Sequence, residues 1–187
     1  MFKNIFLASY PKSGNTWLRA IILSALQQNN IINLKDLSKI RLLSDKMNFT
    51  SFKNKIYEKK GLIDYDWMSK NIISCQKKLN ENTKYNFFFK THSVRHKSFT
   101  NETVNAGFIY IVRDPRDVVV SLSNFSGINL DEAINQVVFN KLLMTNANGA
   151  RELVSNWELN IKSWLEYKSV PCLFIRYEDL LIKPNNI

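Results

Sequence analysis

The octapeptide YPKSGNTW at Tyr10–Trp17 decides the fold of this chain. It follows an apolar run at Ile5–Ala8 and precedes apolar residues at helical spacing between Leu18 and Leu26. The order is therefore strand, tight turn and helix. Because the first backbone N–H groups of a helix are unpaired and the helix dipole favours negative charge there, the turn predicts an anion site, with phosphate as the expected ligand.

The composition is that of a folded chain. Its 187 residues suffice for one domain with a substantial core, and 45% of them are hydrophobic, which argues against disorder. No apolar run approaches the ~20 residues of a membrane span, and the first strand begins too early for a signal peptide. The two distant cysteines, Cys75 and Cys172, favour a reduced, cytoplasmic protein, although a disulfide between them stays open.

The formal net charge of +10 is compatible with a nucleic acid, an anionic membrane or an anionic small molecule as partner. The lysines are scattered along the chain, and pairs such as Lys59-Lys60 and Lys77-Lys78 are typical of a solvated surface. We therefore expect no nucleic-acid partner, and a gel shift that responds to salt is the observation that would contradict this.

Apolar runs and helical patterns alternate along the chain. Four runs read as strands buried on both faces: Ile5–Ala8, Phe87–Phe89, Phe108–Val112 and Cys172–Ile175. Helical patterns lie at Thr16–Gln28, after Pro115 with Val118, Val119 and Leu122, at Leu130–Thr145 and at Glu152–Tyr167. This alternation predicts an α/β fold of three layers, in which helices flank a central parallel sheet.

The segment Asn29–Asn86 differs from the rest because it is polar and rich in Lys and Asn. It is too long for a plain loop, so it should contain helices of its own. Its scattered aromatic residues favour core positions, with a binding pocket as the alternative: Phe49, Phe52, Tyr57, Tyr65 and Trp67. Since no linker divides the chain, we expect a single domain over residues 1–187.

The anion loop departs from the nucleotide-triphosphate loop, in which a lysine follows the second glycine. Here Lys12 precedes Gly14, yet the loop offers the same physical means of binding a phosphate. Gly14 lets the backbone approach a ligand closely, and Lys12 supplies a mobile charge. Ser13, Asn15 and Thr16 add donors. The alternative is an ordinary turn and helix cap.

A second constellation begins where the strand Phe108–Val112 ends. Arg113 follows this strand directly, Pro115 suits the first position of a helix, and Ser121 lies two turns further on. Parallel sheets bind ligands at the carboxyl ends of their strands, and an arginine there suits bidentate binding of phosphate. The alternative is that Arg113 pairs with Asp114 or Asp117.

Together these motifs resemble the sulfotransferases that use 3′-phosphoadenosine 5′-phosphosulfate (PAPS). The match covers YPKSGNTWL, the later VRDPRDVVVS, the FKTH of Phe89–His92 and the RYEDL of Arg176–Leu180. The four motifs occur in the order of that family and span nearly the whole chain. The resemblance implies a P-loop NTPase-like sulfotransferase fold, PAPS as sulfuryl donor and its desulfated product PAP.

The resemblance also implies roles for single residues. His92 is the general base, Lys12 stabilises the leaving phosphate and Lys90 assists near the sulfuryl group. Arg113 and Ser121 hold the 3′-phosphate. The remaining nucleotide contacts are expected from Ser13, Gly14, Asn15, Thr16, Trp17 and Tyr177, of which Trp17 and Tyr177 lie near the base. The moving group carries less charge than a phosphoryl group, so lysines should suffice and no metal is expected.

Three departures from the family pattern matter. Asn15 replaces the usual threonine, and Ser93-Val94 follows His92 where animal cytosolic members have Leu-Pro. The chain ends at Ile187, before the segment in which family members carry a further loop for the 3′-phosphate. We therefore expect a C-terminally short sulfotransferase domain, with a fragment, a short member and an inactive copy as the open alternatives.

The sequence leaves the function open within limits. The alternative to an active enzyme is a catalytically weak protein that only binds the nucleotide, and a P-loop kinase of small molecules is a further hypothesis. The acceptor is a hydroxyl or amine on a small molecule, a carbohydrate or a lipid. Its pocket is expected between Asn29–Asn86 and the residues after His92. The oligomeric state stays open.

Overall fold

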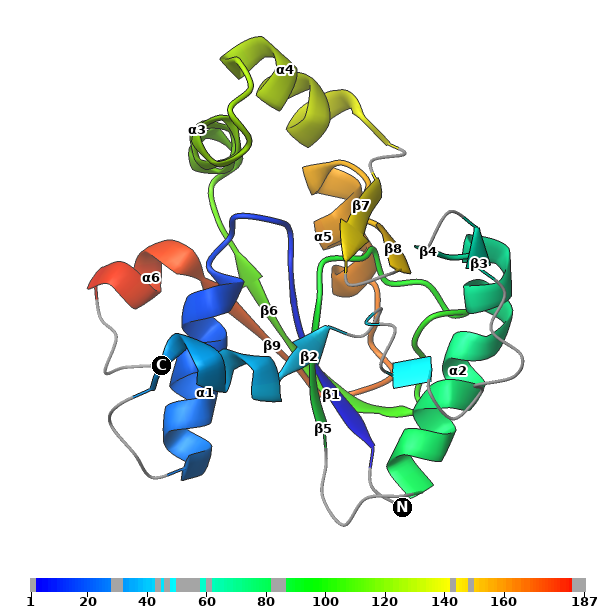
Figure 1. Cartoon of the computed structure of the whole chain (residues 1–187). Helices are drawn as coiled ribbons and strands as arrows, with labels where there is room; N and C mark the ends of the chain where they lie inside the picture. The colour runs from blue at the N-terminus through cyan, green and yellow to red at the C-terminus, as the bar shows by residue number, and fades with distance from the viewer. Residues whose placement is uncertain are drawn as a thin grey trace.

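The computed structural model describes residues 3–27, 32–42, 45, 48–49, 58–59, 62–81, 87–141, 144–147 and 150–182. A five-stranded sheet forms its centre, built from β1 (Asn4–Ser9), β2 (Arg41–Leu42), β5 (Phe87–Thr91), β6 (Asn105–Val112) and β9 (Cys172–Arg176). The strand order is β2-β5-β1-β6-β9, and all neighbours are parallel (Figure 1). The predicted strands and the predicted α/β class are therefore confirmed.

Two hydrophobic clusters cover the two faces of this sheet. Along β1, Phe6 and Ala8 belong to one cluster and Leu7 belongs to the other, as the alternation of a strand requires. The Leu7 face is covered by α1 (Asn15–Gln27), the 3-10 helix η1 (Leu34–Lys39) and α6 (Tyr177–Ile182). The other face is covered by α2 (Tyr65–Glu81) and α5 (Trp157–Leu165), as Figure 1 shows.

A third cluster lies beyond the carboxyl ends of the strands, at the top of Figure 1. It packs Tyr10 against residues of α3 (Pro115–Ser126), α4 (Leu130–Ile134) and the π-helical segment η3 (Asn135–Phe139). The predicted helix after Pro115 is confirmed. Asp114 caps it by accepting a hydrogen bond from the backbone N–H of Arg116 at 2.9 Å.

The helix predicted over Leu130–Thr145 is wrong in its second half. Helix α4 passes into η3, which ends at Phe139, and Asn140 then adopts extended backbone angles. The strand β7 (Met144–Ala147) follows and pairs antiparallel with β8 (Ala150–Leu153). In the sequence the paired strands are separated by Asn148-Gly149, a dipeptide typical of hairpin turns, and the prediction from apolar spacing alone did not take it into account.

The helix predicted over Glu152–Tyr167 begins five residues later than expected. Residues up to Leu153 belong to β8, and α5 starts at Trp157. The side chain of Asn156 accepts a hydrogen bond from the backbone N–H of Leu159 at 2.9 Å and so caps the helix. The asparagine cap therefore fixes a boundary that the apolar spacing alone did not locate.

The segment predicted to contain its own helices does contain α2 and η1. It also supplies the edge strand β2 and a small antiparallel pair, β3 (Glu58–Lys59) and β4 (Leu62–Ile63). Phe49 is fully buried and its ring lies 6.0 Å from that of Trp67, so both act in the core. Phe52 and Tyr57 lie outside the described residues.

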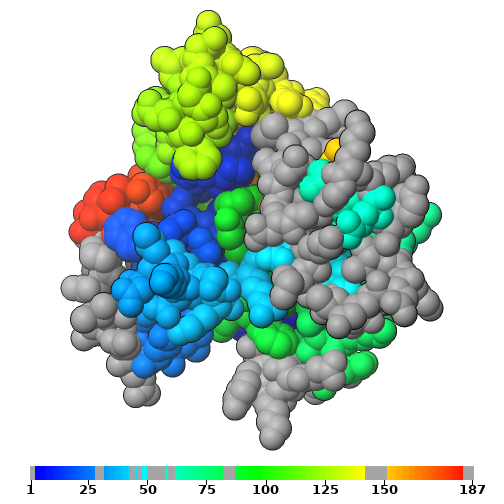
Figure 2. Space-filling view, in the orientation of Figure 1, coloured from blue at the N-terminus to red at the C-terminus, as the bar shows by residue number. Residues whose placement is uncertain are grey.

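The space-filling view shows the face on which the motifs meet (Figure 2). The dark blue of the N-terminal segment and the green of the segment around β5 come to the surface at the centre of this face, below α3. None of the helices in the described ranges combines the length and the apolarity that a bilayer-spanning helix requires.

Candidate active site

The register of the sheet brings the predicted site residues to one edge. Ala8 of β1 pairs with Thr91 of β5 on one side and with Tyr110 of β6 on the other. The segments that follow these three strands therefore leave the sheet side by side. They surround a cavity of about 510 Å³ whose lining includes Pro11, Lys12, Gly14, Asn15, Thr16, Leu42, Lys90, His92, Arg113, Ser121, Phe125, Glu152 and Tyr177.

Gly14 is required at its position in the anion loop for two reasons. Its φ of +95° lies in the left-handed region that side chains rarely adopt. A Cβ atom at Gly14 would also overlap the ring of Tyr177, 2.8 Å from Cε2. The backbone of Gly14, just before α1, therefore packs directly against the ring of Tyr177.

Lys12 and Arg113 are tied together through the backbone. Lys12 has a φ of +66°, and its carbonyl oxygen accepts a hydrogen bond from Nη1 of Arg113 at 3.1 Å. Of the two carboxylates expected as alternative partners of Arg113, only Asp117 lies near it, with Oδ2 3.9 Å from Arg113 Nε. Asp114 instead forms an ion pair with Arg116 at 2.6 Å. Arg113 thus joins the anion loop to the second constellation and lines the cavity.

Ser13 and Asn15 turn their side chains into the protein. The Oγ atom of Ser13 is buried and makes no protein hydrogen bond. Asn15 donates from Nδ2 to the carbonyl oxygen of Leu7 at 2.9 Å and to Oγ of Ser9 at 3.2 Å. The amide of Asn15 therefore ties the loop to β1, whereas Thr16 is exposed at the mouth of the cavity.

The imidazole of His92 is oriented by β1. Its Nδ1 atom lies 2.9 Å from the carbonyl oxygen of Ser9 and 3.1 Å from Ser9 Oγ. Because a carbonyl oxygen only accepts, Nδ1 carries the hydrogen and Nε2 keeps a free lone pair. Burial, with help from the charge of Lys90, lowers the pKa of His92 to about 3. The imidazole is therefore neutral at pH 7, and its free Nε2 lone pair can accept a proton, although the lowered pKa makes it a weaker base than a free histidine.

Positive charge gathers around this imidazole. Burial lowers the pKa of the Lys90 ammonium, and the charge of Arg19 lowers it further, while Glu152 acts in the opposite direction. Burial and the nearby Arg113 lower the pKa of Lys12, whose ammonium lies 3.7 Å from the ring centroid of Phe125. A cavity with several cations in its wall suits a multiply charged anion.

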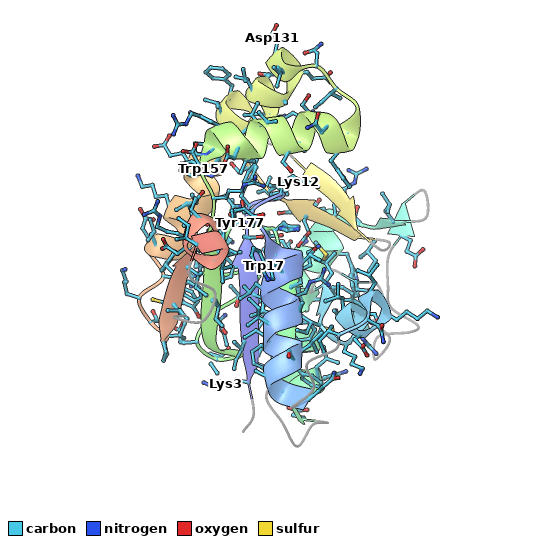
Figure 3. The ribbon with its side chains drawn as sticks, turned by 90° about the vertical axis from the view of Figure 1, so that its left-hand side faces the viewer. Lys3, Lys12, Trp17, Asp131, Trp157 and Tyr177 are labelled. Atoms are coloured by element: carbon cyan, nitrogen blue, oxygen red, sulfur yellow. The ribbon has the colours of Figure 1, made fainter. Side chains whose placement is uncertain are left out.

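A second hollow of about 340 Å³ opens beside the first, and both are lined by Gly14, Thr16 and Tyr177. Trp17 and Tyr177 form its aromatic wall, with ring centroids 6.0 Å apart in an edge-to-face arrangement. Figure 3 shows Trp17 in the first turn of α1 and Tyr177 at the start of α6, both below Lys12. The guanidinium of Arg113 lies 4.4 Å from the centre of the Tyr177 ring. Flat aromatic walls of this kind suit a planar base.

Five further residues belong to the site and were not predicted. Arg19 acts on Lys90 and His92 by its charge, whereas Pro11, Leu42, Phe125 and Glu152 line the cavity. Phe125 lies four residues after Ser121 on α3, so helical spacing from Ser121 could have found it. Glu152 carried no such signal, because its segment was expected to begin a helix. Within the described ranges, His, Cys, Asp and Glu form no group of three that could hold a metal ion.

Comparison with known proteins connects this geometry to one family. The family model named Sulfotransferase domain matches residues 2–186. The chain belongs to the sulfotransferase family. Flavonol 3-sulfotransferase of Flaveria bidentis is 26% identical over 97% of the chain and 53% of its own length. Cytosolic sulfotransferase 7 of Arabidopsis thaliana is 24% identical over 97% and 52%. The chain therefore spans about half the length of these curated sulfotransferases.

Solved structures share the fold of this chain. Retinol dehydratase in complex with androsterone and the inactive cofactor PAP superposes with a TM-score of 0.57 at 19% identity, over 97% of this chain and 56% of that one. Mouse sulfotransferase SULT7A1 complexed with PAP gives a TM-score of 0.54 at 21% identity, over 97% and 53%. These similarities establish the fold.

Proposed function

We propose that this sulfotransferase-family protein transfers the sulfuryl group of PAPS to a hydroxyl or amine acceptor. The observation that carries the proposal is the orientation of His92, whose Nδ1 is fixed on Ser9 while the lone pair of Nε2 stays free in a cavity lined by Lys12, Lys90 and Arg113. Structural neighbours of this fold are complexed with PAP, which supports PAPS as the donor.

The cavities fit such a donor in two respects. Gly14 lines the cavity directly before α1, so the unpaired N–H groups at the start of this helix are available to bind a phosphate. Arg113 and Ser121 line the same cavity and would hold the 3′-phosphate, while Trp17 and Tyr177 would flank the adenine. Ser13 and Asn15 would contribute mainly backbone N–H groups because their side chains are buried, whereas Thr16 would also offer its exposed hydroxyl.

In the proposed reaction, Nε2 of His92 accepts the proton of the acceptor as the acceptor oxygen or nitrogen bonds to sulfur. The bond between sulfur and the bridging oxygen breaks, and the ammonium of Lys12 stabilises the negative charge that this oxygen gains. Lys90 stabilises the sulfuryl oxygens. Preorganised charges of this kind supply most of the catalysis in group transfer, and the scheme requires no metal ion.

The acceptor body is proposed to lie in a third cavity of about 510 Å³ next to the residues that follow His92. Its wall combines Tyr65 and Ser69 of α2 with Val94 and Phe99 of the segment after β5. This largely apolar lining with scattered hydroxyls suits a small molecule or lipid better than a free carbohydrate. A cytoplasmic location belongs to the same proposal, and both described cysteines are unpaired.

The test compares the wild-type protein with His92→Gln. We expect labelled sulfate to move from PAPS to a member of an acceptor panel, at least 100-fold more slowly in the variant. Calorimetric affinity for PAP should be similar in both proteins. Lys77→Gln, on an exposed lysine of α2 that lines none of the three cavities, is the control. Binding of PAP without turnover on any acceptor would favour a nucleotide-binding protein, and a folded protein that binds no PAP would contradict both readings.

A further inference from the structure

Glu152 is a buried acid in the wall of the cavity. It lies on β8, its side chain is 2% exposed, and it shares the cavity lining with Lys90 and His92. Glutamates are almost never fully buried unless they are paired, because a buried charge without partners is strongly unfavourable. None of the four motifs that carry the family resemblance contains this residue.

The contacts of Glu152 converge on the turn that carries the base. Its Oε1 atom accepts hydrogen bonds from Thr91 Oγ1 at 3.1 Å, from the backbone N–H of His92 at 3.2 Å and from Ser93 Oγ at 3.4 Å. These donors belong to three successive residues. The backbone continues the link, because the N–H of Val94 donates to the carbonyl oxygen of Leu153 at 2.9 Å. Strand β8 therefore holds the turn after β5.

Several features favour the ionised form of Glu152. All three partners of Oε1 are donors, which suits an acceptor-only carboxylate. Burial raises the pKa of the carboxyl above its ordinary value, and the hydrogen bond from His92 and the charge of Lys90 reduce this rise without reversing it. Lys90 in turn experiences the positive charge of Arg19 from α1 and lies beside His92, with Lys12 and Arg113 in the same cavity. In its ionised form Glu152 is therefore the anionic neighbour of these cations.

We propose that Glu152 is a positioning residue that fixes the Thr91–Ser93 turn through hydrogen bonds and, through its negative charge, keeps the Lys90 ammonium protonated beside the base. This role rests on the proposed sulfotransferase function. Two separable consequences follow from it: one depends on the acceptor oxygen of the side chain and the other depends on its charge.

Two variants separate these consequences. Glu152→Gln keeps an acceptor oxygen in nearly the same volume and removes the charge, whereas Glu152→Ala removes both. The control is Glu158→Gln, which neutralises an exposed glutamate on α5. The direct measurement is the titration of the Lys90 ammonium by NMR in protein with labelled lysine, with its signal assigned from Lys90→Arg. The second measurement is the pH dependence of turnover.

We expect the Lys90 ammonium in Glu152→Gln to lose its proton about one pH unit lower than in the wild-type protein. The alkaline limb of the turnover profile should move in the same direction, and Glu158→Gln should change neither quantity. Glu152→Ala should also displace the backbone amide signals of His92 and Ser93 and lower turnover about tenfold.

An unchanged Lys90 titration in Glu152→Gln would overturn the charge role. Unchanged amide signals and turnover in Glu152→Ala would overturn the positioning role. If Glu152→Ala does not fold, Glu152→Gln decides instead. Because this variant keeps an acceptor oxygen, its His92 and Ser93 amide signals should match the wild type, and displaced signals would overturn the positioning role. If the wild-type protein shows no turnover, the proposed function fails on its own. The Lys90 titration and the amide signals still decide the role of Glu152 in that case.

Discussion

The Nδ1 atom of His92 lies 2.9 Å from the carbonyl oxygen of Ser9, so the backbone of β1 orients the imidazole of the segment after β5. The first prediction concerns this imidazole. Its NMR signals should not titrate between pH 5 and 8, because burial and the charge of Lys90 lower the pKa of His92 to about 3. In Lys90→Met the pKa of His92 should rise, and His92→Asn identifies the signal.

The same shift makes stability depend on pH. Between the ordinary value of ~6.5 and about 3, the unfolded chain binds a proton at His92 that the folded protein does not bind. The free energy of unfolding contributed by His92 is therefore fully present above pH 6.5 and falls as the pH is lowered through this window. Urea unfolding at pH 7 and pH 5 should show a smaller difference for His92→Asn than for the wild type.

The second prediction compares two glycines with positive φ. Gly14→Ala should destabilise the protein by roughly 2–5 kcal/mol, because it adds an overlap with Tyr177 to the strain of the left-handed backbone. Gly127→Ala has open space around its Cβ and should cost only the strain, about 1–2 kcal/mol. Thermal unfolding measures both, and equal losses would contradict the packing argument. Tyr177→Ala should recover part of the loss in Gly14→Ala.

The third prediction concerns the two arginines that follow β6. Arg113→Lys removes the donor to the Lys12 carbonyl oxygen and the planar fork that suits a phosphate, so affinity for PAP should fall about tenfold or more. Arg116→Lys changes a side chain that is 88% exposed and pairs with Asp114, so affinity should stay within about twofold. Calorimetry measures both, and equal affinities would contradict a phosphate role for Arg113.

The fourth prediction concerns Lys12. In Lys12→Met, turnover should fall by about 10²–10³ because the leaving oxygen loses its stabilising charge, while PAP affinity falls less. Lys97→Met, on an exposed lysine of the segment after His92, is the control for a change in overall charge. A parallel loss of turnover and PAP affinity in Lys12→Met would indicate a binding role alone.

The fold followed from the sequence because its signals are local. Continuous apolar strands such as Phe108–Val112 and the turn at Tyr10–Trp17 carry their meaning in adjacent residues. The direction of the Asn15 side chain could not be read from adjacent residues. The sequence suggested a ligand contact, whereas the amide of Asn15 donates hydrogen bonds to Leu7 and Ser9 of β1. Glu152 reaches the backbone of His92 only through the β7–β8 hairpin, and the helical spacing of the apolar residues in this segment misled the prediction.

The central position of β1 has a consequence for how the protein is made. Ser9 meets His92 across 83 residues of chain, and Lys12 meets Arg113 across 101. At the usual ~5–20 residues per second of synthesis, the anion loop therefore waits roughly 5–20 seconds for the partners that complete it. Until β6 is made, at least one edge of β1 lacks its partner strand, so a nascent chain stalled before β6 would expose a hydrophobic strand to chaperones and to aggregation.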